Sequence, residues 1–271
     1  MHSAGFVMAI ITISKSMLLT AALLSLVILL GCNKTKEIKT NIEAPKEHYA
    51  VFDTGPGIVY ISNNKDLLGY LSTFLNDMPQ PIYNSIKYYL DNNAGNTELI
   101  QLLEKPGKEL TPIEHANYCL ILFFITNDKI SRLDQLFAAV DEYPYNDSGI
   151  SIGVMLSIWL DGHQFSDLAD YFILKSKDSN PKYKICANLA LGVFYTNPDV
   201  LNQLISELSR DEDFVKWSAL ISLNNIVENN PDVNTVLIRD SLRNVINNGN
   251  WMVKEQVESL LSLLEFREKY N

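Results

Sequence analysis

The chain has few cysteines and a deficit of positive charge. Its 271 residues include three cysteines, and 22 lysines and arginines stand against 32 aspartates and glutamates, for a net charge of −10. Three cysteines are too few for a disulfide scaffold. An acidic chain lacks the cations that neutralise nucleic-acid phosphates or an anionic membrane surface. We therefore expect neither as a partner of the folded body.

Long apolar runs are also missing, with one exception near the N-terminus. Met17–Leu30 contains no charged residue, and Lys15 precedes it. A membrane-spanning helix needs about 20 apolar residues, so this shorter run is typical of the hydrophobic region of a signal peptide. Translation from Met1, Met8 or Met17 would include it, and the sequence leaves that choice open.

The residues after this run carry a more specific motif. Leu29-Leu30-Gly31-Cys32 resembles the lipobox of bacterial lipoproteins: an aliphatic residue, a tolerated second position, a small residue and a cysteine. The resemblance implies cleavage between Gly31 and Cys32 and acylation of Cys32, which anchors the chain in the lipid bilayer. Asn33, in place of the aspartate that retains such proteins in the inner membrane, implies the periplasmic face of the outer membrane. The alternative is a chance cysteine after an uncleaved anchor.

The sequence divides into three segments. Residues 1–31 are the expected signal peptide, and residues 32–47 are a polar, lysine-rich segment that cannot bury enough apolar surface to fold, so we expect a flexible tether. Residues 48–271 contain no further linker and are expected to form one helical-repeat domain. At its start, residues 48–62 hold two short β-prone runs around Gly55-Pro56-Gly57, which predict a small hairpin.

Helical spacing of apolar residues begins after Asn63 and continues to the C-terminus, which predicts an all-α fold. Residues 64–105 predict three shorter helices. Thr111-Pro112-Ile113-Glu114 is a capping box with proline at the first helical position, and it predicts a helix start. Further helix caps are expected at Ser148, Ser166, Asn180, Asn197 and Asn230.

The later helices recur with a nearly constant period. Equivalent apolar positions fall at intervals of 32–38 residues, with anchors at His115, Ile150, Tyr183, Val215 and Val253. Two helices per interval indicate an α-solenoid of stacked helix pairs, clearest over residues 110–271. Asp213-Phe214-Val215-Lys216-Trp217-Ser218-Ala219-Leu220 resembles the first helix of a HEAT-type repeat, with an acidic cap, a Val-Lys pair and a following alanine. The alternative is an irregular helical domain whose helices have similar lengths.

Two acidic triplets resemble catalytic motifs. Asp53-Thr54-Gly55 and Asp147-Ser148-Gly149 have the form of the paired aspartic-protease triplets. The first continues into a predicted hairpin turn and the second into a predicted helix start, so turn and cap roles are expected instead. Cys119 and Cys186 fall inside apolar helical segments and are expected to be small buried residues.

A set of acids and one histidine offers metal-ligand chemistry, namely Asp161, His163, Asp167 and Asp170. These residues fall in an inter-helix turn and at a helix start, where acids favour the positive end of the helix dipole. We therefore expect helix capping here, and we expect no metal site, no cofactor and no catalytic residue in the chain.

Aromatic residues at helix ends are the best candidates for partner binding, namely Tyr88, Tyr89, Tyr143, Tyr145 and Trp251. Helix ends and turns are where a solenoid displays side chains, and Tyr and Trp dominate binding hot spots. Each of these residues alone could instead fill space between helices.

These observations favour a lipid-anchored periplasmic protein that binds another protein, as an adaptor or an immunity-type protein. Stacked repeats provide a long binding surface, and the acidity favours a basic partner. An enzyme is less favoured, the alternative being an envelope hydrolase that acts on cell wall or glycan through an unrecognised carboxylate pair. A third hypothesis is a purely structural protein of the envelope.

Overall fold

The computed structural model describes residues 52–53, 58–59, 61–73, 75–142, 148–161 and 165–270. All of them belong to the unit formed by residues 48–271. The predicted signal peptide and tether, with Gly31 and Cys32, lie outside the described residues, as do Tyr143, Tyr145 and His163.

The described part of the chain is helical apart from one short pair of strands. Strands β1 (Phe52–Asp53) and β2 (Ile58–Val59) pair antiparallel, and this pair is what the structure describes of the predicted hairpin. Short 3₁₀ turns, η1 (Leu75–Asp77) and η2 (Ser166–Leu168), precede α3 and α8. The helices are α2 (Asn64–Gly69), α3 (Gln80–Asn92), α4 (Thr97–Glu104), α5 (Pro112–Ile125), α6 (Lys129–Glu142), α7 (Ser148–Leu160), α8 (Ala169–Ser176), α9 (Pro181–Leu191), α10 (Pro198–Glu207), α11 (Asp213–Asn229), α12 (Thr235–Asn248) and α13 (Trp251–Tyr270).

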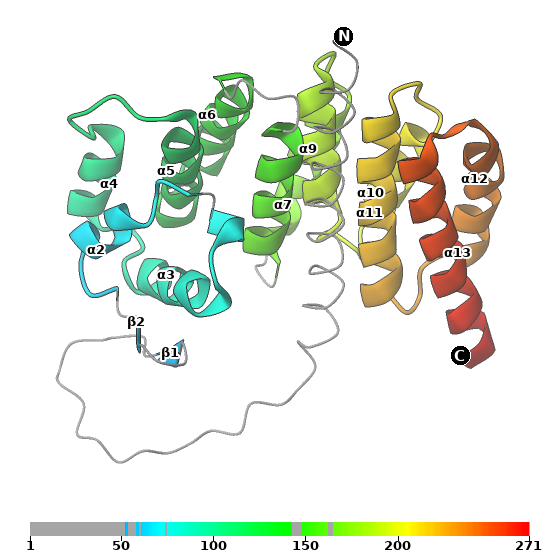
Figure 1. Ribbon diagram of the computed structural model, residues 1–271, viewed down its shortest axis with the longest axis horizontal. Coiled ribbons are helices and arrows are strands. Elements are labelled where there is room, and N and C mark those ends of the chain that lie inside the picture. The colour runs from blue at the N-terminus through cyan, green and yellow to red at the C-terminus, as the bar shows by residue number, and fades with distance from the viewer. Residues whose placement is uncertain are drawn as a thin grey trace, which may run out of the picture. The chain divides into compact units, whose positions relative to one another are not determined.

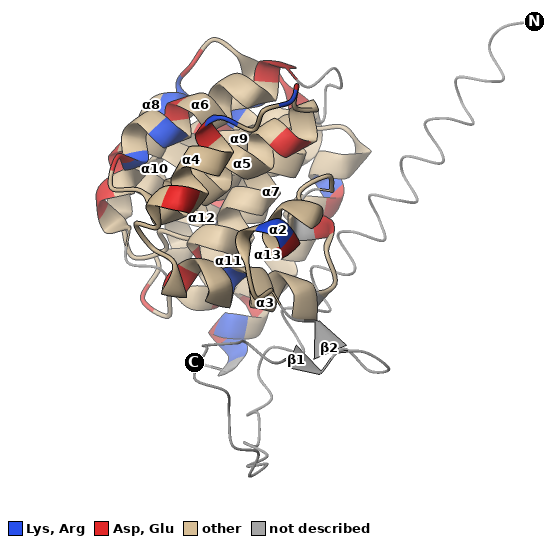
Figure 2. Ribbon diagram, turned by 90° about the vertical axis from the view of Figure 1, so that its left-hand side faces the viewer, with Lys and Arg blue, Asp and Glu red and all other residues tan. Residues whose placement is uncertain are grey.

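The helices form two layers. Helices α7, α9, α11 and α13 stand side by side in chain order (Figure 1), and each packs on the next. Helices α8, α10 and α12 form the second layer, and α6 packs on α5 in the same way at the start of the stack. Seen along the stack, α6, α8 and α10 lie together on one side (Figure 2). This arrangement confirms the predicted all-α, solenoid-like fold.

The helix pairs are offset from the pairs expected from the sequence. Because each interval begins at an anchor, the sequence predicts that an anchor-bearing helix pairs with the helix that follows it. In the structure α8 packs mainly on α9, α10 mainly on α11, and α12 on α13. From α8 onward the packing unit is therefore an even-numbered helix followed by an odd-numbered one, whereas α5 pairs with the α6 that follows it, as expected.

The register of α7 also differs from the expected superposition. The superposition of the anchors also aligns the residues four positions after them, of which Ala187, Ala219 and Val257 are fully buried in α9, α11 and α13. Their predicted counterpart in α7, Val154, is only half-buried, whereas Leu156 has no exposed surface. The fully buried apolar positions of α7 are Ile152, Met155 and Leu156, whereas Val154 packs at the edge of a smaller cluster with Ile185 and Val215.

Glycines on the face of α7 that meets α9 account for this different burial pattern. A Cβ atom at Gly153 would lie 2.9 Å from the Cα atom of Cys186 and 2.9 Å from Leu189 Cδ1, and one at Gly149 would overlap the backbone oxygen of Lys182. Because these glycines let the two backbones approach closely, the contact stripe of α7 contains no large residue at those positions. A search for apolar periodicity therefore selects a neighbouring stripe.

Several predicted helix caps are confirmed. Thr111 Oγ1 accepts a hydrogen bond from Glu114 N (3.3 Å), and Glu114 Oε2 accepts one from Thr111 N (3.0 Å), so the capping box of α5 is complete. The side chains of Asn180 and Asn197 cap α9 and α10, each followed by proline in the first helical turn.

The prediction for Asn230 is wrong. Asn230 ends α11, and Asn234 caps α12 by accepting a hydrogen bond from Leu237 N (3.0 Å). Asn230 Oδ1 instead accepts from Asp232 N (3.0 Å), while its amide nitrogen donates to Tyr195 O (2.8 Å). Because Asn-Pro favours turns as well as helix starts, the dipeptide alone does not separate the two.

The two serine caps also differ from the prediction. Ser148 begins α7, but its hydroxyl donates to Val140 O (3.0 Å) and so joins α7 to α6. Phe165, not Ser166, is the residue that precedes η2, and no side chain caps that turn.

One continuous apolar core runs through the stack from Ile61 to Leu264. Its largest side chains are aromatic, and Trp159 packs edge-on against Tyr83 with ring centroids 5.0 Å apart. Among the described helices, none combines the length and apolar character that crossing a bilayer requires.

Candidate functional site

The inner helices run parallel, so their starts lie along one edge. At the C-terminal ends, Arg267 of α13 donates from Nη1 to Val227 O (2.6 Å) and to Asn230 O (2.9 Å) of α11. At the opposite ends, Lys184 near the start of α9 forms an ion pair with Glu212 immediately before α11 (3.5 Å). Bonds at both ends place the starts of neighbouring inner helices side by side.

We call this edge the N-terminal rim, which comprises residues 148–150, 179–184, 209–216 and 250–254. Two large aromatic side chains are exposed on it. Phe214, in the first turn of α11, is 45% exposed, and Trp251, the first residue of α13, is 59% exposed. They belong to adjacent parallel helices, whose axes typically lie 8–10 Å apart. Neither ring belongs to the buried core.

Sequence reasoning identified Trp251 but missed Phe214. Phe214 was treated as part of the repeat motif, although it lies outside the buried stripe that Val215 and Ala219 begin. An aromatic residue in the first helical turn, one position before the apolar stripe, is the sequence signal that indicates its exposure. Tyr143 and Tyr145, which precede α7 in the chain, lie outside the described residues.

The other two aromatic candidates lie on α3, at the opposite end of the stack from α13 (Figure 1). Tyr88 is 37% exposed. Tyr89 is buried, and its hydroxyl donates to Asn64 Oδ1 (2.9 Å), which ties α3 to α2. The structure therefore does not bring the candidates together in one surface.

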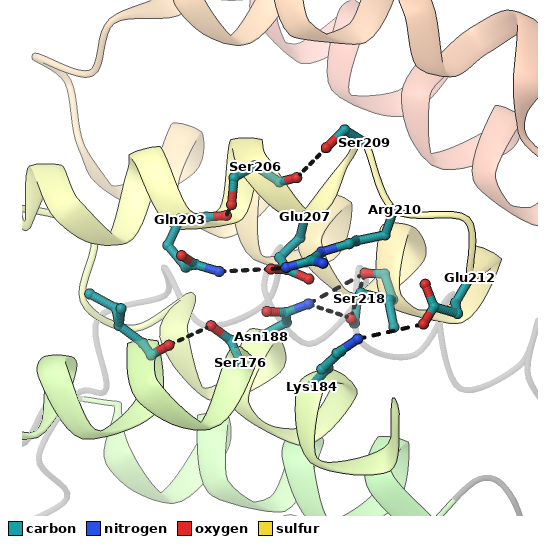
Figure 3. Close-up of polar contacts among 12 residues, drawn as sticks. Ser176, Lys184, Asn188, Gln203, Ser206, Glu207, Ser209, Arg210, Glu212 and Ser218 are labelled. Carbon is teal, nitrogen blue, oxygen red and sulfur yellow. Dashed lines mark hydrogen bonds and ion pairs between the residues drawn. The ribbon is translucent and has the colours of Figure 1, made fainter. Parts of the chain in front are cut away.

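A cluster of polar side chains lies between α9, α10 and α11 and includes part of the rim (Figure 3). Its members are Lys184, Asn188, Gln203, Glu207, Arg210, Glu212, Asp213, Lys216, Ser218 and Ser222. Its most unusual member is Glu207, the last residue of α10, which has no exposed surface. Gln203 Nε2 donates to Glu207 Oε1 at 2.7 Å, and Arg210 Nη2 lies 3.4 Å from the same oxygen. The second oxygen, Oε2, receives no hydrogen bond from any described residue. Burial raises the pKa of this carboxyl above its ordinary value, and Arg210 offsets only part of the effect.

Two lysines of the cluster are more than nine-tenths buried. Lys184 reaches Glu212, as above, and Lys216 Nζ lies 2.9 Å from Asp213 Oδ1. They occupy equivalent positions of the repeat in α9 and α11, and both neutralise acids at the start of α11. A backbone hydrogen bond at its own amide, together with the charge of Lys184, lowers the pKa of Glu212.

Side-chain amides and hydroxyls join α9 to α11. Asn188 Nδ2 donates to Ser218 Oγ (3.2 Å), and Ser222 Oγ donates to Asn188 O (2.6 Å). One turn further on, Asn225 Nδ2 donates to Gly192 O (2.9 Å). These bonds fix the register of two inner helices, so this part of the cluster is structural.

A second cationic site lies between α6, α8 and α9. The ammonium group of Lys175 is 5.3 Å from the ring centroids of both Phe137 and Tyr171 and 5.9 Å from that of Tyr183. It also forms an ion pair with Asp134 (2.8 Å). This aromatic cage resembles a site for a ligand cation, but the protein's own lysine occupies it.

A recess of about 300 Å³ between α4, α5 and α6 contains His115 and Cys119. His115 Nδ1 lies 2.6 Å from Glu142 Oε2, an arrangement that orients the ring. Cys119 is buried, and burial raises the pKa of its thiol to about 12. A nucleophilic cysteine needs a thiol with a lowered pKa. Cys119 is therefore not an activated thiol, although His115 lines the same recess.

Acidic and histidine side chains do not converge elsewhere in the described ranges, where no group of three or more metal-ligating residues occurs. Asp161, Asp167 and Asp170 are exposed, while His163 and Asp147 lie outside the described residues. Cys186 is fully buried, and neither it nor Cys119 forms a disulfide.

No family model, no curated protein and no solved structure matches this chain.

Proposed function

We propose that the protein is a lipid-anchored protein of the bacterial envelope whose helical-repeat body binds another protein through the N-terminal rim. The observation that carries the proposal is the exposure of Phe214 and Trp251 on adjacent parallel helices. Aromatic side chains provide large contact areas at a low entropic cost, and they are enriched at the centres of protein interfaces. Of the other tryptophans, Trp159 is buried in the core.

The anchoring part of the proposal depends on the lipobox. Cleavage before Cys32 and its acylation would place residues 33–47 between the bilayer and the folded body. Acyl chains contribute about 0.8 kcal/mol per buried CH₂, so several chains would hold the protein at the membrane permanently. In this proposal the body faces the periplasm from the outer membrane, and the motif in α11 makes it HEAT-like.

We expect the net charge of the chain to speed its encounter with the partner more than it raises the affinity of the complex. The net charge of −10 favours a basic partner at long range. At the rim itself, Lys184, Lys216 and Arg210 are engaged by acids of the same chain. In the end-on view, basic and acidic residues are interspersed over the helices (Figure 2). Aromatic contact therefore supplies the specific part of the proposed interaction.

The alternative, an envelope hydrolase, requires an accessible carboxylate pair. Glu207 has the raised pKa that a general acid needs, but it has no exposed surface and a glycan would not reach it. No observation in the described residues favours this alternative over the binding function.

The test is capture of partners by the lipidated, C-terminally tagged protein from crosslinked envelopes, read by mass spectrometry. Phe214→Ser with Trp251→Ser removes both rim aromatics. Phe266→Ser is the matched control, because Phe266 is an aromatic residue 62% exposed near the other end of α13. We expect a stoichiometric partner that the rim variant loses and the control keeps.

A Cys32→Ser variant separates anchoring from binding. We expect it to lose membrane attachment and to recover the partner less efficiently. Equal recovery by the rim variant and the wild type would exclude the rim as the binding surface. Recovery of the bait alone under all growth conditions would contradict the binding function itself.

A further inference from the structure

The corner between α10 and α11 encloses a carboxyl group that does not fit its site as an anion. Glu207 has no exposed surface, and burying a charge is costly unless hydrogen bonds and counter-charges compensate for it fully. Here Gln203 donates to Oε1 (2.7 Å), but Oε2 receives no hydrogen bond from a described residue. The described residues therefore hydrogen-bond only one of the two carboxylate oxygens.

Two further features favour the neutral form. Glu207 is the last residue of α10, and the C-terminal end of a helix carries partial negative charge. Arg210 lies 3.4 Å away, longer than the roughly 2.7–2.9 Å of a strong charge-assisted bond, and its side chain is 43% exposed. Arg210 thus compensates for the anion only weakly.

The charged groups around Glu207 come from each neighbouring element. Helix α9 contributes Lys184, which is engaged by Glu212 of the turn before α11 (3.5 Å). The same turn contributes Arg210. On α11, Lys216 is engaged by Asp213 (2.9 Å). The nearby side chain from α8 in Figure 3 is the neutral Ser176. An ionised Glu207 would compete with Glu212 for Lys184.

We propose that Glu207 is a proton-dependent latch on the corner between α10 and α11. With its proton, the carboxyl group is neutral, its burial costs less than that of the anion, and the corner is closed. When the proton is lost, the buried anion draws Arg210 and Lys184 away from their present positions and the corner loosens. Residues 209–216 of this corner are also part of the N-terminal rim and carry Phe214.

The direction of the pH dependence follows from burial. Because burial raises the pKa of Glu207, the folded chain keeps this proton to a higher pH than the unfolded chain does. The latch therefore stabilises the corner at low pH, and this contribution is lost as the pH rises through the pKa of the folded state. A salt-bridged surface carboxylate has the opposite dependence.

The experiment is residue-resolved amide hydrogen exchange on the full chain over a pH series, corrected for intrinsic exchange rates. In the wild type, amides of residues 203–216 should lose protection as the pH rises. Glu207→Gln, which keeps the shape of the neutral acid, should keep protection across the series. Glu255→Gln, at an exposed position on α13, is the control and should behave like the wild type.

A second measurement keeps the proposal testable if Glu207→Gln does not fold. Carbon-13 detection of the Glu207 side-chain carboxyl in the wild type reports its titration midpoint directly. A midpoint above the ordinary value of 4.5 supports the latch, and a midpoint at or below it overturns the latch. An equal loss of protection in the wild type and in Glu207→Gln would also overturn it.

Discussion

Replacing Gly149, Gly153 and Gly69 by alanine, one at a time, should change stability by three different amounts. Alanine in a helix gains about 0.5–1 kcal/mol over glycine when its methyl group has room. Gly69, at the end of α2, has nothing within 4 Å of a new Cβ, so this variant should show no loss and a gain of at most that amount. It serves as the control for the two glycines of α7.

At Gly153 a new methyl group would meet Leu189 Cδ1 and the Cα atom of Cys186, both at 2.9 Å. The leucine side chain can rotate, but the backbone cannot, and overpacking of this kind costs about 1–3 kcal/mol. Subtracting the helix-propensity gain leaves a net loss of about 0–2.5 kcal/mol.

At Gly149 the obstructing atom is the backbone oxygen of Lys182, which has no freedom to move independently of α9. We expect the top of the overpacking range, a net loss of about 2 kcal/mol or more. For a domain of this size that corresponds to a fall in Tm of about 4–8 °C. Urea denaturation followed by far-UV circular dichroism measures all three variants. Equal stability of the Gly149 and Gly69 variants would refute the close contact between α7 and α9.

Three further predictions concern the polar and thiol groups. Asn188→Ala removes a buried amide that joins α9 to α11 and should cost about 1–3 kcal/mol in urea denaturation, whereas Asn229→Ala, at an exposed position of α11, should cost much less. Lys175→Met keeps the apolar stem but loses the cation inside the aromatic cage, and should cost about 1 kcal/mol against no loss for the exposed Lys177→Met. In the Cys32→Ser variant, iodoacetamide at pH 8 should alkylate Cys119 and Cys186 only as fast as the protein unfolds, because burial raises the pKa of both thiols; rapid alkylation without denaturant would contradict this burial.

Local signals in the sequence were sufficient to predict half of the six expected helix caps. The capping box at Thr111 and the caps at Asn180 and Asn197 depend on residues within four positions of each other, and the structure confirms them. The all-α class was predictable for the same reason, because apolar spacing is a local property of a helix.

Features that depend on distant partners were not predictable. Asn230 follows the end of α11, and its side chain donates to Tyr195 O in the turn between α9 and α10. The register of α7 depends on glycines facing α9, which leave no apolar signal. Within the candidate site, Tyr89 is buried while the adjacent Tyr88 is exposed, and their sequence context does not distinguish them. The burial of Glu207 arises from three helices meeting around the end of α10.

From α8 onward, the pairing of each even-numbered helix with the odd-numbered helix after it defines how this part of the stack can grow or shrink. When α10 and α11, or α12 and α13, are removed or duplicated together, the contacts between the two helices of the pair stay intact. A cut between α10 and α11 would instead expose the apolar faces of both helices. Length changes among related chains are therefore expected as insertions or losses that begin in the turn before an even-numbered helix, since the energetics of such arrays are dominated by contacts between neighbours.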